Sequence, residues 1–362
     1  MAAVYAVVMA GGRGERFWPL SEEARTKPFV PLLGPRTLLQ QTVERLDPLV
    51  PPERVLISIG ETHHRLAREQ LPEIPEENFI VEPLARDTSA CLGYSALHLE
   101  RRDPDAVMIA IPADHYVGDA AAYRTTLERA IRSLEGVTAV VFGVRPVRPE
   151  SGYGYVQARR PASGREHDPW PVVRFVEKPD RATAARYLES GDYFWNSGIF
   201  VWRNRTLLAL FERHMPATYR GLCELRPLLA REGAERERRS VFAGLERLSV
   251  DFGILERSDG LVLVPVEFPW DDIGNWAALE RALPADAFGN VARGAHVAVN
   301  STGCVVYTDA GTVATFGVSD LVVVQANGKV LVTTKERAAE LKRVVSALGP
   351  EHAPKEQRGE TE

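Results

Sequence analysis

The chain is poor in cysteine and in long apolar runs, and each shortage excludes a class of protein. Its three cysteines, Cys91, Cys223 and Cys304, lie far apart and form no Cys-x-x-Cys pair. Neither a disulfide framework nor a cysteine zinc site is therefore indicated. The apolar run at the N-terminus is much shorter than a membrane-spanning helix and lacks the basic start of a signal peptide. We expect a cytoplasmic protein with no membrane association.

The chain also has little net charge. Its 44 basic side chains against 49 acidic ones leave a formal charge of −5. That balance lacks the cationic excess of a dedicated nucleic-acid binder, so no nucleic-acid partner is expected. Local charges must therefore meet any anionic ligand.

Lysine is scarce, because only six of the 44 basic residues are lysines. Two of them, Lys27 and Lys178, each precede a proline. A lysine ammonium is a compact point charge that can follow a phosphoryl group, whereas the guanidinium of arginine is a larger planar fork. The two lysines are therefore candidate phosphate contacts, with a chance surface position as the alternative.

Strand-like and helix-like segments alternate over the first 145 residues. Short β-branched strands are predicted at 4–9, 54–59, 78–82, 106–111 and 138–143. Amphipathic helices are predicted between them, at 37–46, 62–71, 88–102 and 120–134. This alternation is typical of an α/β fold with a parallel sheet, which binds ligands at the carboxyl ends of its strands.

The second half of the chain has a mixed texture and ends in a β region. A helix is predicted at 181–190, a helical region at 204–248 and a strand at 261–268. Short strand-like segments separated by Gly, Asn and Asp follow, closed by one helix from about Lys335 to Leu348. We predict a domain at 1–285, a small β domain at 286–348 and a disordered tail at 349–362. The exposed β edges are a candidate surface for a homodimer.

A glycine-rich loop follows the first predicted strand. Its glycines leave backbone N–H groups open to a phosphate, with three cations nearby: Gly11, Gly12 and Gly14, with Arg13, Arg16 and Lys27. The loop is not a P-loop, because no Lys-Ser or Lys-Thr pair occurs, and it lacks the third glycine of the dinucleotide fingerprint. A triphosphate site is favoured over a turn without a ligand.

Two aspartates follow predicted strands and form a candidate metal site. Asp114 comes just after the strand at 106–111, and Asp272 follows the strand at 261–268. Paired carboxylates suit Mg²⁺, which takes one or two of them together with phosphate oxygens and water. Either aspartate could instead cap a helix, and the adjacent Asp271 is a competing ligand.

The chain resembles the sugar-nucleotide nucleotidyltransferases, and more specifically the mannose-1-phosphate guanylyltransferases. The resemblance begins with AGGRGERFWPLS and KPFVPL and covers nearly the whole chain. It continues, in the family's order, through EPLARDTSA, PADH, SGYGYV, FVEKP, FWNSGIF, SVDFGILE and WDDIGNW. It implies a Rossmann-like nucleotidyltransferase domain followed by a small β domain that has the form of a left-handed β-helix.

The resemblance also implies the reaction and the roles of individual residues. GTP and α-D-mannose 1-phosphate would give GDP-mannose and pyrophosphate, with Mg²⁺ bound by Asp114 and Asp272, the latter favoured by the W-x-D-x-G spacing. Arg16, Lys27 and Lys178 would be catalytic. Nucleotide contacts would come from Gly11, Gly12, Arg13, Gly14, Arg86, Asp87, Thr88 and Asp114. Sugar-phosphate contacts would come from Gly154, Glu177, Lys178 and Asn196.

The segment expected to read the base departs from the family. It reads EPLARDTSA where the family pattern is closer to EPxGRNTAPA, so Asp87 stands in place of an asparagine. A carboxylate at 87 could accept hydrogen bonds from the N1–H and N2 amine of guanine. Two alternatives therefore stay open: a transferase for another sugar 1-phosphate or nucleotide, and a non-catalytic regulator that binds a sugar nucleotide.

The proposed chemistry requires no general base. The second pKa of a phosphate monoester is about 6, so its attacking oxygen is already ionised at neutral pH. Positioning and charge neutralisation remain as the tasks of the protein. His115, beside Asp114, is the one histidine of interest, and a hydrogen-bonded structural role is expected for it.

Overall fold

The computed structural model describes residues 2–11, 15–165 and 168–348. The predicted tail at 349–362 lies outside this range. The chain forms two compact units. The sheet unit comprises Met1–Gly11, Val43–Ala113 and Asp119–Phe268, and the coil unit comprises Gly12–Thr42, Asp114–Gly118 and Pro269–Glu362. The three cysteines carry free thiols.

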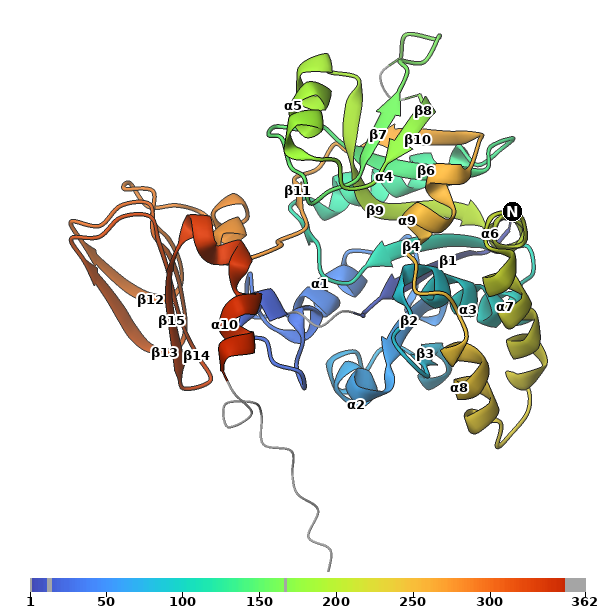
Figure 1. Ribbon diagram of the computed structural model, residues 1–362, viewed down its shortest axis with the longest axis horizontal. Helices are drawn as coiled ribbons and strands as arrows, with labels where there is room; N and C mark the ends of the chain where they lie inside the picture. The colour runs from blue at the N-terminus through green and yellow to red at the C-terminus, as the bar shows by residue number, and fades with distance from the viewer. Residues whose placement is uncertain (1, 12–14, 166–167, 349–362) are drawn as a thin grey trace, which may run out of the picture. The chain divides into compact units, whose positions relative to one another are not determined.

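A nine-stranded sheet forms the centre of the sheet unit (Figure 1). Its order is β3-β2-β1-β4-β9-β6-β10-β8-β7. The strands are β1 (Val4–Met9), β2 (Val55–Gly60), β3 (Phe79–Glu82), β4 (Val107–Pro112), β6 (Ala139–Val144), β7 (Tyr155–Ala158), β8 (Trp170–Val176), β9 (Tyr193–Arg203) and β10 (Leu261–Pro265). All five strands predicted over the first 145 residues are confirmed to within one residue at each end.

The sheet is not wholly parallel, because β9 lies antiparallel between β4 and β6. A strand in the middle of a sheet is buried on both faces, and the run Ile199–Trp202 of β9 is 0–1% exposed. Those buried residues place β9 in the centre although it is distant in sequence from both neighbours. Asn196, which lies in β9, is thereby brought beside β6 and β7.

Several helices contact strands of the sheet, and local signals set the ends of some of them. The helices are α1 (Leu38–Glu44), α2 (Glu61–Gln70), α3 (Asp87–Arg102), α4 (Ala120–Arg132), α5 (Arg181–Ser190), α6 (Asn204–His214), α7 (Pro216–Leu228), α8 (Glu235–Ala243) and α9 (Val250–Gly253). Asp119 and Asp180 cap α4 and α5 with their carboxylates. The predicted helical region at 204–248 is three helices, since Pro216 starts a new one at its first position. Among them, α3, α6 and α7 contact one another (Figure 1).

The coil unit contains a short ladder and a four-stranded sheet. β5 (Tyr116–Val117) pairs antiparallel with β11 (Trp270–Asp271). The larger sheet contains β12 (Val291–Val299), β13 (Val305–Phe316), β14 (Leu321–Ala326) and β15 (Lys329–Thr334). β12, β13 and β14 run parallel to one another, as strands in successive turns of a β-helix do, and β15 pairs antiparallel with β14. The handedness of the coil stays a prediction.

One apolar core joins this sheet to the N-terminal part of the coil unit. Alternate residues of β13, β14 and β15 point inward and pack with side chains that follow the glycine-rich loop. The members include Val305, Tyr307, Val324 and Leu331 from the strands, and Phe17, Leu20, Val30 and Leu32 from the N-terminal segment. Segments almost 300 residues apart in sequence therefore share one interior.

The prediction of a single closing helix was wrong. The chain forms a 3₁₀ helix at Lys335–Glu340 and then α10 (Lys342–Ala347). Leu341, between them, is 2% exposed and belongs to the core of the coil unit, so the helical path is broken where this side chain packs inward. Within the described ranges, no helix is both long and apolar enough to cross a bilayer.

Candidate active site

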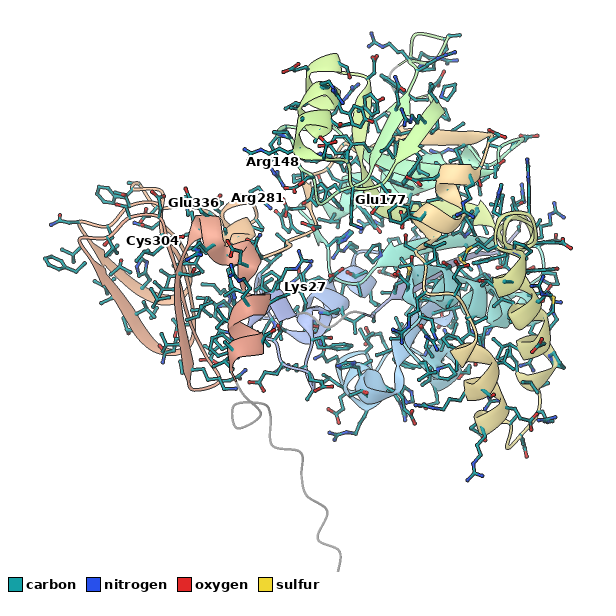
Figure 2. The ribbon with its side chains drawn as sticks, in the orientation of Figure 1. Lys27, Arg148, Glu177, Arg281, Cys304 and Glu336 are labelled. Atoms are coloured by element: carbon teal, nitrogen blue, oxygen red, sulfur yellow. The ribbon has the colours of Figure 1, made fainter. Side chains whose placement is uncertain are left out.

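Lys27 forms the centre of the candidate site in the coil unit. It begins a 3₁₀ turn, Lys27–Phe29, with Pro28 in the first turn, and it is 8% exposed. Its Nζ donates to Oδ2 of Asp114 at 2.9 Å and to the main-chain carbonyl of Asp272 at 2.5 Å. The ring of Phe17 lies 5.7 Å from the ammonium (Figure 2 labels Lys27). The structure thus brings together three residues that the sequence predicted as site residues.

Asp114 is held in its ionised form. Burial would raise the pKa of this carboxyl, but the charge of Lys27 and then that of His115 outweigh burial, and the pKa falls below its usual value. Nε2 of His115 lies 3.8 Å from Oδ1 of Asp114, and the His115 ring packs edge-on against Trp270. Asp114 therefore offers a carboxylate at neutral pH, with about one-third of its side chain exposed.

Asp271 and Asp272 have different surroundings. Both carboxylate oxygens of Asp271 accept hydrogen bonds from Arg281, at 2.5 and 2.9 Å, and the residue is 5% exposed. This ion pair neutralises Asp271 inside the unit (Figure 2 labels Arg281). Asp272 is half-buried, and the Cβ position of Gly274 lies 3.2 Å from its Oδ2 and 3.6 Å from Nη1 of Arg16. The prediction of Asp272, and not the competing Asp271, as the metal ligand stays a prediction.

The structure describes only part of the glycine-rich loop. Gly12, Arg13 and Gly14 lie outside the described residues. Gly11 is exposed, and a Cβ added there would meet nothing within 4 Å. The roles predicted for these four residues stay predictions.

A second cluster lies in the sheet unit, where Gly154, Glu177, Lys178 and Asn196 come together. The main-chain N–H of Asn196 donates to the main-chain carbonyl of Gly154 at 2.8 Å. A Cβ built at Gly154 would overlap Oε2 of Glu177, so only glycine leaves room for this carboxylate. All four residues predicted to bind the sugar phosphate are therefore neighbours.

Glu177 carries an unused acceptor. Its Oε1 accepts from Nζ of Lys178 at 2.7 Å. Its Oε2 is buried and has no hydrogen-bond partner among the residues that the structure describes (Figure 2 labels Glu177). A buried oxygen without a partner is unfavourable, and a ligand hydroxyl would supply the missing hydrogen bond.

Asp251 is a member of this cluster that the sequence did not reveal. It lies in α9, 55 residues from Asn196, and its Oδ1 accepts from Nδ2 of Asn196 at 2.8 Å. Burial of the carboxyl, and then the charge of Glu177, raises the pKa of Asp251 to about 6. The segment SVDFGILE contributed to the family resemblance, but nothing in its spacing indicated that Asp251 would contact Asn196.

The predicted base-reading residues bind mainly to the protein itself. Arg86 donates to the carbonyls of Phe242 and Ala243 at the end of α8. Oγ1 of Thr88 accepts from the amide of Val250 at 2.9 Å, at the start of α9. Both residues therefore fix the start of α3 to its neighbours.

Asp87 also lies in the electrostatic field of Lys178. Its Oδ1 accepts from the amide of Thr88 at 2.7 Å, and its backbone has a φ of 69°. Burial lowers the pKa of Lys178, but the hydrogen bond and charge of Glu177 outweigh it. The charges of Asp251 and Asp87 raise that pKa further, above the usual value. Asp87 therefore contributes to the electrostatic potential at Lys178.

Comparison with known proteins identifies the family. The model of the nucleotidyl transferase family matches residues 5–287, and that of the MannoseP isomerase/GMP-like beta-helix domain matches residues 294–348. The chain belongs to the nucleotidyl transferase family. This confirms the predicted fold class, a Rossmann-like nucleotidyltransferase domain with a β-helix-like C-terminal domain.

Named relatives of this nucleotidyl transferase cover nearly its whole length. It is 35% identical over 346 residues to a mannose-1-phosphate guanylyltransferase of Escherichia coli, which covers 94% of this chain and 73% of the relative. A second, from Escherichia coli strain K12, is 36% identical over 355 residues, with 95% and 73% covered. The crystal structure of a mannose-1-phosphate geranyltransferase from Thermus thermophilus has 42% identity and a TM-score of 0.87, with 95% and 99% covered.

The residues around Lys27 suit a divalent cation in this nucleotidyl transferase. No group of three or more His, Cys, Asp or Glu side chains arranged for a metal occurs among the described residues. Asp114 and Asp272 nevertheless carry hard oxygen donors, and the Lys27 ammonium contacts the carboxylate of Asp114 and the main-chain carbonyl of Asp272. This donor set fits an ion that obtains its remaining ligands from phosphate and water.

Replacing Asp251 by asparagine tests the newly found neighbour of Asn196. We expect Asp251→Asn to raise the KM for the sugar phosphate about tenfold and to leave the KM for the nucleotide unchanged. The charged acceptor that orients the amide of Asn196 would be lost, and hydrogen bonds to charged groups contribute about 1.5–3 kcal/mol. Initial-rate kinetics with each substrate varied would measure both constants. The matched control is Asp105→Asn, an exposed carboxylate paired with Arg205.

The pH dependence gives a second measurement of the role of Asp251. Because its pKa is raised to about 6, the carboxylate form is lost as the pH falls through 6. The ratio of the wild-type kcat/KM to that of Asp251→Asn should therefore decrease as the pH is lowered through about 6. The titration of the sugar phosphate itself cancels in this ratio. An equal rise in both KM values, or a ratio independent of pH, would contradict the positioning role.

Proposed function

We propose that this nucleotidyl transferase transfers GMP from GTP to α-D-mannose 1-phosphate, giving GDP-mannose and pyrophosphate. One observation carries the proposal: Glu177, with its buried unused oxygen, lies beside Lys178, Asn196 and Gly154. A carboxylate acceptor next to an ammonium suits a ligand that has both hydroxyl and phosphate groups. The curated relatives named as mannose-1-phosphate guanylyltransferases support the choice of GTP and mannose 1-phosphate.

The proposed reaction is one in-line displacement at phosphorus. An ionised oxygen of mannose 1-phosphate attacks the α-phosphorus of GTP and forms the new P–O bond, while the bond to pyrophosphate breaks. Lys178 holds the attacking phosphate, and Glu177 and Asn196 hold the sugar. Arg16 and Lys27 stabilise the charge that develops on pyrophosphate. No side chain removes a proton, since the attacking oxygen is ionised near neutral pH.

Asp114 and Asp272 are the residues that we propose to hold Mg²⁺. The ion, when bound, neutralises charge on the phosphate oxygens. The protein contributes the two carboxylates, the Lys27 ammonium and the Arg281 ion pair that keeps Asp271 occupied.

The remaining proposals concern the protein as a whole. We propose a catalytic domain at 1–285 and a small β domain at 286–348, which the limits of the two matching family models support. We further propose a cytoplasmic enzyme that acts on small molecules and forms a homodimer through the β domain. Analytical ultracentrifugation of the full chain and of a variant with charged residues on the β edges would test the dimer.

A substrate panel tests the proposed reaction. Pyrophosphate release would be measured from each of the four common nucleoside triphosphates with mannose 1-phosphate and with glucose 1-phosphate. We expect the highest kcat/KM for GTP with mannose 1-phosphate. A higher kcat/KM for another combination of nucleotide and sugar phosphate would establish a different substrate specificity. Calorimetric binding of a sugar nucleotide with no turnover of any pair would establish the regulator instead.

Asp87 is proposed to read guanine, and its replacement separates two roles. We expect Asp87→Ala to reduce the preference in kcat/KM for GTP over ATP about tenfold, the size of a lost charged hydrogen bond. An unchanged preference would remove Asp87 from base recognition. A changed KM for the sugar phosphate in the same variant would show that Asp87 acts through its charge on Lys178. Asp105→Ala serves as the control on an exposed carboxylate of the same unit.

A further inference from the structure

The ammonium of Lys27 contacts both residues that are proposed to hold the metal, Asp114 through its carboxylate and Asp272 through its main-chain carbonyl. Nζ is 2.9 Å from Oδ2 of Asp114 and donates to the carbonyl of Asp272. The side chain is 9% exposed, so solvent provides little competition for either contact. The positive end of Lys27 therefore already neutralises the carboxylate that the proposed reaction assigns to a divalent ion.

A divalent ion and the Lys27 ammonium cannot both approach Asp114 closely without strong repulsion. Like charges a few ångströms apart repel, and the repulsion grows as water is excluded. Lys27 must therefore move away from Asp114, or acquire a negative partner of its own, before a divalent ion can bind. A nucleoside triphosphate supplies such a partner, because its oxygens attract an ammonium strongly.

We propose that Lys27 keeps divalent ions out of the free enzyme and releases Asp114 to the metal when a triphosphate binds. This inference rests on the proposed function only in taking Asp114 and Asp272 as metal ligands. One cation replaces another: the ammonium transfers to the triphosphate, and the divalent ion enters with the nucleotide. The order of loading is therefore nucleotide and metal together, and the free enzyme is expected to bind the metal alone weakly.

Removing the charge of Lys27 tests the proposal without any assay of activity. Mn²⁺ would be titrated into the full chain in the absence of nucleotide, with bound ion followed by electron paramagnetic resonance and by calorimetry. We expect Lys27→Met to bind one Mn²⁺ at least tenfold more tightly than the wild type. Lys27→Arg, which keeps the charge, should bind Mn²⁺ as weakly as the wild type. GTP should increase Mn²⁺ binding to the wild type.

The controls separate a local effect from a general one. Lys335 pairs with Glu280 at 2.7 Å in the same unit, so Lys335→Met removes a paired lysine elsewhere and should leave Mn²⁺ binding unchanged. The double variant Lys27→Met with Asp114→Asn should lose the gained site. Circular dichroism and thermal melting of each variant would show that it is folded.

Two results would overturn the proposal. The first is a folded Lys27→Met enzyme that binds Mn²⁺ no more tightly than the wild type. The second is tight binding of one Mn²⁺ to the free wild type that disappears in Asp114→Asn. A different preferred sugar or nucleotide would appear in the substrate panel and would leave these titrations as they are, so failure of the proposed function is distinguishable.

Discussion

Replacing Asp114 by alanine is expected to lower kcat for pyrophosphate release by about 10³-fold or more. Asp114 is the carboxylate that Lys27 contacts at 2.9 Å, and its pKa is held below the usual value. The substitution would remove a proposed metal ligand and leave the buried ammonium of Lys27 without this partner. Electrostatic groups that act on developing charge typically contribute about 10²–10³-fold each, so loss of two effects together exceeds that range.

Two further variants accompany Asp114→Ala: one that keeps the size of the Asp114 side chain, and one that changes a carboxylate outside the candidate site. Asp114→Asn keeps the size of the side chain and removes its charge, so it should lose activity to a similar extent. Asp105→Ala removes an exposed carboxylate paired with Arg205 and should retain full activity. Circular dichroism would establish that each protein is folded. A folded Asp114→Ala enzyme with more than a tenth of wild-type kcat would exclude the assigned role.

Lys27→Arg is expected to reduce kcat about 10²-fold although it conserves charge. The lysine is 8% exposed, with Phe17 on one side and Asp114 on the other. The planar guanidinium is larger than the ammonium and cannot make the same two hydrogen bonds here, although it still places a positive charge beside Asp114. It would also follow the moving charge of the leaving group less closely. Steady-state kinetics at saturating substrates would measure the loss.

A second lysine of the same unit is the matched control for Lys27→Arg. Lys329 forms an ion pair with Glu22 at 2.5 Å. Lys329→Arg should retain wild-type kcat, because this partly buried ion pair takes no part in the proposed reaction. Full activity in Lys27→Arg would refute the requirement for a compact charge at this position.

Local sequence patterns predicted the strands of the sheet but not its complete order. β1, β2, β3, β4 and β6 follow from short apolar runs between helices, which depend on neighbouring residues only. β9 lies antiparallel between β4 and β6 because its apolar residues can be buried there. That choice depends on partners far away in sequence, which periodicity does not specify.

The candidate site was predicted where the family motifs marked it. The sequence predicts both Lys27 and Asp114, which are 87 positions apart, as site residues, and the two form a direct contact. Asp251 was missed, because its role depends on a hydrogen bond to Asn196 that only folding creates. Arg86 and Thr88 were predicted as nucleotide contacts, and the structure adds that both bind the main chain of neighbouring helices. Contacts of that kind cannot be predicted from the spacing of residues in the sequence.

The shared apolar core of the coil unit limits where the protein can be truncated or recombined. Val305, Tyr307 and Leu331 belong to the same apolar core as Phe17 and Leu32, which flank the turn that carries Lys27. A truncation after residue 285 would expose those two side chains to water and would take away the packing that shapes the turn. The C-terminal coil is therefore not a detachable module, and exchanging it between enzymes would require exchanging the segment at 15–42 with it.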